Sequence, residues 1–490
     1  MRALQNGAMV ELEIKFQLEA EALAWWHDAL TAQQASRERL RAVYVDTADG
    51  RLAQARVALR LRREGTRWVQ TLKAEGDSAI HRLEHEVTLS ARGNATPALD
   101  IARHIGSPAH SRLLQALGDA PPDALVTRFE TDVSRLKRRV LTAGGTDVEI
   151  ALDLGSVRAA GRSDAIAELE LEHKGGPEEG LFEVARDVVA RGGAWLSTIS
   201  KAERGESLRS GGASDATKAA PMPQLRHVDG ASWLRAALRN VLAQVLPNAS
   251  AVAAGSRDAE RIHQLRVGLR RLRTVVRELA ALSDAMAPAW EHTLRDAFVA
   301  LGAQRDNQAA AEAVRPLLHG AVSWPPANAV DTAAAVRAPA LQATLIAALA
   351  LAHAPDAAFT PFARKALKAT VATRLQHLHR QVLRDGRRFD TLADERAHRV
   401  RKRLKRLRYL AELTPGLWPQ KAVARFVAQL KPAQDVLGHH NDVSVAARML
   451  REDAQHGAAE SLDKHLLTTR REARTVLRKL PRDKAYWKTR

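Results

Sequence analysis

The segment Val10-Glu-Leu-Glu-Ile-Lys-Phe-Gln-Leu18 alternates without interruption between apolar and polar side chains. The two-residue period of a β-strand places the apolar side chains on one face and Glu11, Glu13, Lys15 and Gln17 on the other. A single strand of this kind usually has an ordinary solvated face. Several later segments, however, repeat the pattern with charges of both signs. A sheet that curls with these faces inward would enclose a wet, highly charged cavity, which suits a metal ion and a polyanion.

The rest of the N-terminal half also has the texture of short strands. Strand-like segments follow at 41–46, 57–63, 68–74, 82–89, 126–133, 135–141, 148–154 and 166–174. Helical periodicity is confined to 19–32, 111–117 and 181–192. Many short strands with few long helices predict an antiparallel β-barrel.

The C-terminal half has a different texture. From Leu225 onwards Ala, Leu, Arg and Glu recur at helical spacing, with turns expected at prolines that include Pro247 and Pro432. The small, polar segment 205–224 reads as a linker. We therefore predict an α+β protein with a barrel domain over 9–208, a linker over 209–224 and an all-α helical bundle over 225–485.

Charge is divided unequally between the two halves. The chain has a net charge of +19, but its first 224 residues hold 30 Lys and Arg against 32 Asp and Glu. The remaining residues hold 45 basic against 24 acidic side chains. The helical half should therefore attract a polyanion, which could be nucleic acid, an anionic membrane or polyphosphate.

The amino-acid composition also indicates the cellular compartment in which the protein is expected. The chain contains no cysteine, which excludes disulfides and thiolate metal sites and favours an intracellular location. Its start has no apolar core of signal-peptide length, and residues 1–8 read as a disordered extension. The longest apolar stretch, about 340–354, is too short to span a bilayer and reads as a buried helix. We expect a soluble cytoplasmic protein without a membrane partner.

The helical half contains an internal repeat, so two pseudo-symmetric halves are expected. His263 to Arg273 matches His398 to Arg408, and a Leu-Gly…Asp motif follows each copy, ending at Asp306 and Asp442. At helical spacing each copy aligns a histidine with three basic residues in one stripe. The stripe residues are His263, Arg266, Arg270 and Arg273 in the first copy and His398, Arg401, Lys405 and Arg408 in the second. A bound polyanion would offset the repulsion within each stripe.

Alternating charges in the barrel half predict a metal site. Acidic residues cluster at alternate positions on several strands and would repel one another unless bases or a divalent cation neutralised them. Hard oxygen ligands favour Mg²⁺ or Mn²⁺ over zinc. Arginine and lysine on facing strands would clamp phosphate oxygens.

These residues resemble the CYTH domain of the triphosphate tunnel metalloenzymes. The family's Glu-x-Glu-x-Lys signature is matched at Glu11–Lys15, and further motifs follow in order to Ser200-Lys201-Ala-Glu-Arg204. The resemblance implies an eight-stranded tunnel that binds triphosphates and hydrolyses or cyclises them with a divalent metal. One departure is Leu154, where the family often has arginine, which we expect to make that side of the tunnel less basic.

The resemblance also implies roles for individual residues. The expected metal ligands are Glu11, Glu13, Asp153, Glu168, Glu170 and Glu172. The expected triphosphate-binding residues are Arg60, Arg62, Lys73, Arg82, Arg135, Arg139 and Lys201. Glu84 or Glu86 would place or deprotonate the attacking water, and Lys15 would bond the carboxylates or the leaving phosphate.

The repeated basic stripes resemble the CHAD domain, which implies binding of long-chain inorganic polyphosphate. Nucleic acid is the competing polyanion, but aromatics for base stacking are few and no reader motif stands out. Asp306 and Asp442 are expected to pair with arginine or cap helices. We therefore expect a metal-dependent inorganic triphosphatase tethered to polyphosphate, with association to polyphosphate granules. The alternatives are a non-catalytic polyphosphate-binding protein and a class IV-type adenylate cyclase.

Overall fold

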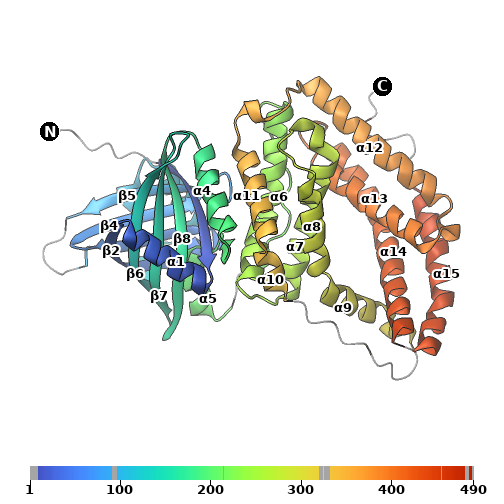
Figure 1. Ribbon diagram of the computed structural model, residues 1–490, viewed down its shortest axis with the longest axis horizontal. Coiled ribbons are helices and arrows are strands. Elements are labelled where there is room, and N and C mark those ends of the chain that lie inside the picture. The colour runs from blue at the N-terminus through green and yellow to red at the C-terminus, as the bar shows by residue number, and fades with distance from the viewer. Residues whose placement is uncertain are drawn as a thin grey trace. The chain divides into compact units, whose positions relative to one another are not determined.

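The computed structural model describes residues 9–90, 96–212, 215–318, 324, 331–453, 455–480 and 485–487 (Figure 1). The expected N-terminal extension, residues 1–8, lies outside these residues. The chain forms two compact units. The first, here called the barrel unit, holds the chain up to Thr217 together with Leu246–Ser256 and Arg337–Ala350. The second, the helical unit, holds Lys218–Val245, Arg257–Val336 and the chain from Leu351 onwards.

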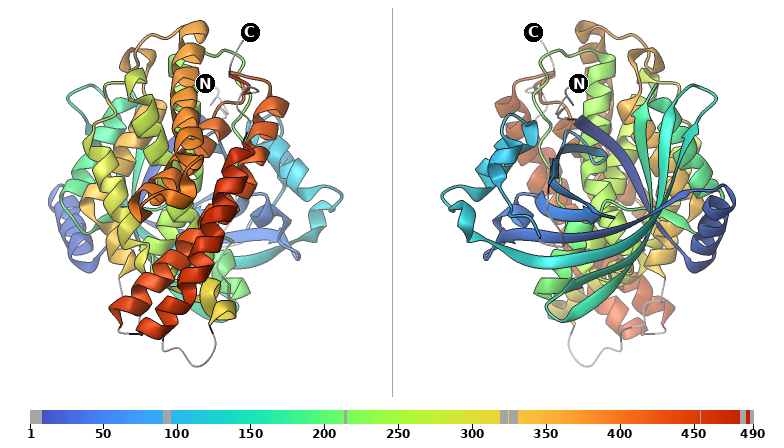
Figure 2. Two further views of the ribbon diagram at one scale, coloured as in Figure 1. Left: turned by 90° about the vertical axis from the view of Figure 1, so that its right-hand side faces the viewer. Right: turned by 90° about the vertical axis from the view of Figure 1, so that its left-hand side faces the viewer.

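The barrel unit is built around an antiparallel sheet. Its strands are β1 (Met9–Leu18), β2 (Ser36–Thr47), β3 (Val57–Glu64), β4 (Arg67–Glu75), β5 (His81–Leu89), β6 (Leu125–Leu141), β7 (Asp147–Ala159), β8 (Arg162–Gly175) and β9 (Ala194–Leu196). Neighbours follow the order β5-β4-β3-β2-β6-β7-β8-β1, and β1 pairs again with β5 to close an eight-stranded barrel (Figure 2). The short β9 adds to β1 alone. The predicted antiparallel barrel is confirmed.

Short helices pack around the barrel and, at one end, against its inner face. They are α1 (Ala20–Ala32), α2 (Arg51–Gln54), the 3-10 turn η1 (Ile101–His104), α3 (Pro108–Leu117), α4 (Glu179–Ala190) and α5 (Lys201–Ser210). Leu59 of β3 and Leu72 of β4 point outward and pack against Leu113 of α3, and all three are fully buried. Because these apolar faces are used outside, the alternating charged faces are left to line the interior.

Three details of the barrel differ from the sequence expectation. The segments 126–133 and 135–141 form one continuous strand, β6, because Ser134 keeps the alternation and pairs with Leu154 of β7. The strand β9 was not expected, since three residues carry no period. The start of the expected linker is helical: α5 runs through Gly205 to Ser210, begun by a capping box between Ser200 and Glu203.

The chain after residue 224 is helical, as predicted. Its helices are α6 (Gly230–Ala253), α7 (Ala259–Leu279), α8 (Ala289–Ala300), α9 (Ala303–Val314), α10 (Thr332–Arg337), α11 (Pro339–His353), α12 (Arg364–Gly386), α13 (Asp394–Glu412), α14 (Gln420–Glu452) and α15 (His456–Arg478). The turns expected at Pro247 and Pro432 were wrong, since both prolines lie inside helices, α6 and α14. A proline removes one N–H, and packing on either side can hold such a helix together.

The apolar stretch near 340–354 forms α11, whose Leu345, Ile346 and Leu349 are buried, as expected. Among the residues that the structure describes, no helix is long and apolar enough to cross a bilayer. In the helical unit, α7 and α13 pack against each other, so the two repeated basic segments are neighbours.

Candidate functional site

The barrel interior holds a cavity of about 1130 Å³ lined by side chains from the inner faces of the strands and from α5. It collects most of the predicted site residues. Those in its lining are Glu11, Glu13, Lys15, Arg60, Arg62, Lys73, Arg82, Glu84, Glu86, Arg135, Asp153, Glu170, Glu172 and Lys201. The charged faces therefore share one space, as the alternation predicted.

Two of the predicted site residues, Glu168 and Arg139, lie outside the cavity lining. Glu168 is outside the lining but is buried directly behind it, where Gln17 donates to it over 3.2 Å. Arg139 lies outside the lining near the β6–β7 turn, where it pairs with Asp147 and its side chain is 57% exposed. The expectation for Leu154 was wrong, because this residue faces outward, into a shallow depression beside Arg158, and leaves the tunnel charge unaffected.

Three carboxylates form a compact acidic cluster in the barrel wall. Asp153 of β7 is the register partner of Glu168 of β8, and Glu170 follows on the same face. One oxygen from each lies within 4.8 Å of the others. Lys201 reaches all three, at 2.8, 2.5 and 2.7 Å respectively. Their hard oxygen donors fit a divalent cation such as Mg²⁺ or Mn²⁺.

Basic side chains keep part of this cluster ionised. Arg135 donates two hydrogen bonds to Asp153, at 2.6 and 2.7 Å, and also pairs with Glu170. Burial would raise the pKa of Glu170, but the charges of Lys201, Arg135 and Lys15 outweigh it and hold that pKa well below its usual range. The pKa of Asp153 is lowered against burial by Lys201 and Arg135 in the same way.

A second group of charges lies where β1, β4 and β5 meet. Lys73 approaches Glu11 at 2.7 Å and Glu84 at 3.1 Å. Burial opposes ionisation of Glu11, yet the charge of Lys73 and hydrogen bonds with Glu84 and Lys73 lower its pKa to about 2. Burial and the neighbouring Glu11 charge raise the pKa of Glu84 well above its usual value, despite Lys73.

Two further carboxyls of the cavity have raised pKa values. Burial and the charge of Glu170 raise the pKa of Glu13, while Lys15 opposes the shift. Burial and the charge of Glu11 raise the pKa of Glu172. A divalent cation beside these two carboxyls would lower both pKa values, because a nearby positive charge favours the ionised form.

Guanidinium groups from β3 reach the same cavity. Arg62 donates to Glu86 over 3.0 Å, and Thr71 donates to the same carboxylate. Arg60 donates to the hydroxyl of Tyr44 over 3.0 Å. Sequence reasoning did not place Tyr44 in the site, although a tyrosine inside a charged strand is a signal that could have found it.

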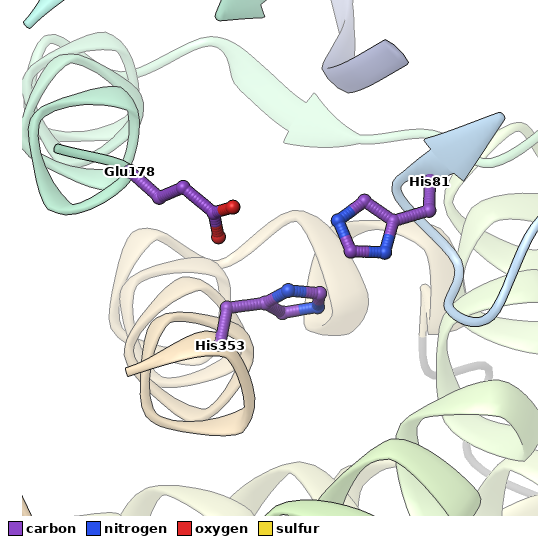
Figure 3. A group of neighbouring side chains, drawn as sticks. All are labelled: His81, Glu178 and His353. Carbon is purple, nitrogen blue, oxygen red and sulfur yellow. The ribbon is translucent and has the colours of Figure 1, made fainter. Parts of the chain in front are cut away.

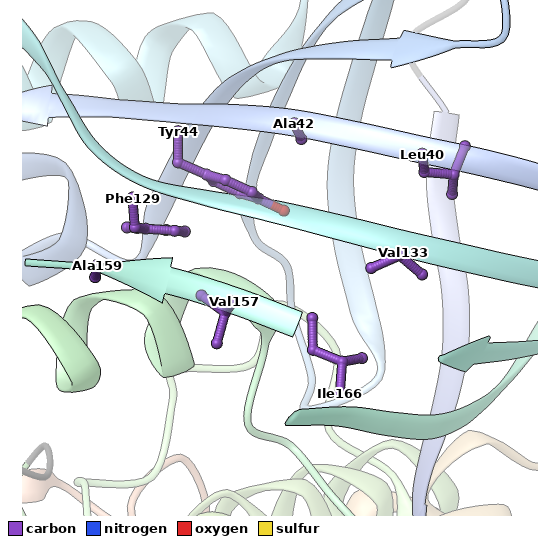
Figure 4. Packing of buried hydrophobic residues seen from close by; sticks show 8 residues of the cluster. All are labelled: Leu40, Ala42, Tyr44, Phe129, Val133, Val157, Ala159 and Ile166. Carbon is purple, nitrogen blue, oxygen red and sulfur yellow. The ribbon is translucent and has the colours of Figure 1, made fainter. Parts of the chain in front are cut away.

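The inner face is apolar at one end of the barrel (Figure 4). Tyr44 stacks on Phe129 with ring centroids 4.5 Å apart. The cluster around them also contains Leu40, Ala42, Val133, Val157, Ala159 and Ile166. Helix α5 packs onto it through Ala202 and Leu208, and Gly205 leaves room for the Phe129 ring. This contact fixes the helix whose first residue is Lys201.

The helical unit brings the two predicted basic stripes together. The charges of Arg270 on α7 and of Arg401 and Arg408 on α13 act on Lys405, and with burial as the largest cause they lower its pKa to about 6. Arg266 and Arg270 lie over the ring of Phe298 on α8, 4.6 and 4.9 Å from its centroid. No period in the sequence points to Phe298.

The remaining stripe residues have defined surroundings. His398 shares a hydrogen bond of 3.0 Å with Asn441, and Arg401 lies 3.9 Å from Asp442, so this aspartate pairs with arginine as expected. Arg266 is buried and donates to the Gly302 carbonyl. Arg273, Arg408 and His263 are half-buried. Arg273 approaches Glu291 at 3.5 Å, and Arg408 approaches Glu412 at 3.5 Å. His263 lies on α7. The side chain of Asp306 lies outside the described residues.

Two potential metal ligands of the barrel unit lie apart from the cavity lining. His81 begins β5 and Glu178 precedes α4 (Figure 3). His353, the third side chain drawn there, ends α11 and belongs to the helical unit. We assign no site to these residues.

Comparison with known proteins defines the class. The sequence matches the CYTH domain family over residues 9–205 and the CHAD domain family over residues 236–451. The chain is thus a CYTH domain followed by a CHAD domain.

Known proteins similar to this chain include one curated relative and several solved structures. The inorganic triphosphatase of Haemophilus influenzae is 27% identical over 213 residues, which is 42% of this chain and 57% of that protein. The chain therefore spans little more than half of this distant homologue. The CHAD domain from Ricinus communis is 25% identical, covering 55% of this chain and 98% of that one, with a TM-score of 0.41. A candidate adenylyl cyclase from Hippeastrum, described as having a dominant triphosphatase activity, is 20% identical, covering 41% and 96%, with a TM-score of 0.28.

Proposed function

We propose that the barrel unit hydrolyses inorganic triphosphate with Mg²⁺ or Mn²⁺ and that the helical unit binds long-chain inorganic polyphosphate. The observation that carries the first part is the single cavity in which a carboxylate cluster and several guanidinium groups converge. Phosphoryl transfer requires positioning and charge neutralisation more than a covalent nucleophile. The distant triphosphatase relative supports the same chemistry.

The cavity supplies the groups for each task. Glu11, Glu13, Asp153, Glu168, Glu170 and Glu172 would hold one or two metal ions. When bound, such an ion neutralises phosphate oxygens and orients water. Arg60, Arg62, Lys73, Arg82, Arg135 and Lys201 would hold the phosphates. Arg139 is left out of this set because it pairs with Asp147 outside the lining.

The water-activating role is proposed for Glu84 or Glu86, which lie on the inner face of β5. Glu86 accepts hydrogen bonds from Arg62 and Thr71 and is therefore oriented. Lys15 lies 3.3 Å from Glu170 and 3.7 Å from Glu13. These contacts favour a role for Lys15 in holding the carboxylates over a contact with the leaving phosphate.

The crowding of like charges supports polyphosphate binding by the helical unit. Lys405 is largely buried among arginines, and a neighbouring polyanion would remove the repulsion. His263, Arg266, Arg270, Arg273, His398, Arg401, Lys405 and Arg408 form the proposed binding set. Single-stranded RNA of equal charge is the control ligand: if it competed as well as polyphosphate, this part of the proposal would be wrong. Binding should weaken steeply as salt rises.

A substrate panel tests the enzymatic part. Phosphate release and cyclic AMP are measured with triphosphate, ATP and long-chain polyphosphate, each with Mg²⁺ or Mn²⁺. The proposal expects release from triphosphate that chelation of the metal abolishes. Absence of release from every substrate would mean a non-catalytic binding protein, and cyclic AMP formation from ATP would mean a cyclase.

A further inference from the structure

The position of Lys201 depends on the connecting segment, residues 196–200, which leads from the last residue of β9 to α5. Lys201 contacts Asp153, Glu168 and Glu170, so a small displacement of its main chain would change contacts with the whole acidic cluster. What holds this segment therefore matters for the proposed function, on which this inference rests.

Three backbone N–H groups of the segment have partners close to the barrel. Ser197 donates to the Lys15 carbonyl over 2.8 Å, which ties the segment to β1. Ile199 donates to the Ser197 hydroxyl, and Ser200 donates to the Glu203 carboxylate over 2.8 Å. These bonds belong to the CYTH-matched part of the chain.

Two further N–H groups have partners from distant sequence. Leu196 donates to the Gln342 side-chain oxygen over 2.8 Å, and Thr198 donates to the Ser250 hydroxyl oxygen over 2.9 Å. Ser250 in turn donates its own proton to the Leu246 carbonyl over 2.7 Å, which leaves its oxygen free to accept. The five consecutive N–H groups from residue 196 to 200 are thus all satisfied.

The two distant partners are well placed to act as fixed anchors. Ser250 and Gln342 are each 1% exposed, so water cannot readily replace them. They lie in α6 and α11, inside the CHAD-matched residues, yet both belong to the barrel unit. Loss of either acceptor would leave an N–H group of the segment without its partner, and the segment would shift to find another.

We infer that Ser250 and Gln342 are positioning residues for Lys201: they fix the main chain that carries this lysine to the acidic cluster. The triphosphate-binding cavity therefore depends on two side chains from the helices that follow the CYTH match. Because they act through Lys201 and touch no substrate, their loss should affect KM for triphosphate more than kcat.

The test uses the full chain with triphosphate and Mg²⁺ or Mn²⁺. Ser250→Ala and Gln342→Leu should lower kcat/KM by about tenfold to a hundredfold, mostly through KM. Ser250→Thr and Gln342→Glu keep an acceptor oxygen and should restore most of the activity. Thr344→Val is the matched control, because the Thr344 hydroxyl donates to the Ala340 carbonyl of its own helix and, among the described residues, has no bond to the segment 196–200. Hydrogen exchange of the peptide spanning 196–200 should accelerate in the two disruptive variants alone.

The outcomes separate this inference from the proposed function. An inactive wild-type protein would defeat the proposed function, and the exchange measurement would still decide whether the two side chains anchor the segment. With an active wild type, Ser250→Ala and Gln342→Leu variants that match Thr344→Val in kcat/KM would overturn the inference. Unchanged exchange at 196–200 would overturn it as well.

Discussion

Because of Lys405, the affinity for polyphosphate should fall as pH rises, and the substitution Lys405→Arg should remove most of this dependence. Burial is the largest cause of its lowered pKa, followed by the charges of Arg270 and Arg401, and Asp442 offsets them only in part. A bound polyphosphate would counter these positive charges and raise the pKa of Lys405. Binding above about pH 6 must then take up a proton.

The size of the effect follows from the two pKa values. A lysine with a pKa of about 6 is half charged at pH 6 and about 1% charged at pH 8. If binding restores an ordinary pKa of about 10.4, the affinity should fall about 50-fold from pH 6 to pH 8, or about 2 kcal/mol. The sign is fixed: affinity is greatest below the free-state pKa and declines as pH rises through it.

Fluorescence anisotropy with end-labelled polyphosphate at constant ionic strength measures this dependence. Lys405→Arg keeps the charge at every pH and should remove most of the decline. Titration of the ligand and of His398 is common to both proteins, so the difference between the two curves isolates Lys405. Parallel curves for the wild type and Lys405→Arg would refute the reasoning.

Three further predictions concern packing and the limits of the site. Gly205→Ala would place a methyl group 2.2 Å from a ring carbon of Phe129, so urea unfolding should show a loss of about 1–3 kcal/mol; an unchanged midpoint would contradict this packing. Phe298→Ala removes the ring beneath Arg270 and should weaken polyphosphate binding by about 0.5–1 kcal/mol, whereas equal titration curves would argue against the contact. Arg139→Ala should keep kcat/KM for triphosphate within twofold of the wild-type value. A tenfold loss would show that Arg139 contributes to the site.

The barrel and most of the residues that line its interior could be predicted from the sequence, because strand period and barrel closure act together. Alternation assigns each charged residue to one face, and closure of β1 on β5 turns every such face into the same cavity. Lys73 and Glu84 could therefore be placed in one site without any knowledge of register. Arg139 shows the limit, since it has the correct parity but lies too far along β6 and finds Asp147 instead.

Long-range side-chain contacts were not predictable in this way. Phe298 contacts Arg270, and Gln342 contacts Leu196, across separations that no local period encodes. The turns expected at Pro247 and Pro432 do not form, because packing elsewhere along each helix outweighs one missing N–H. The sequence predicts two strands, at 126–133 and 135–141, where the structure has one, because Ser134 fits the alternation and continues the pairing with β7.

Phosphate release from triphosphate by the wild type and by Glu13→Ala tests the central claim most directly. With Mg²⁺ or Mn²⁺ the wild type should release phosphate, and Glu13→Ala should lose metal-dependent turnover while keeping the wild-type circular dichroism spectrum. Glu130→Ala, which removes an exposed carboxylate of β6, is the matched control and should remain active. Retained turnover in a folded Glu13→Ala variant would contradict the proposed metal site.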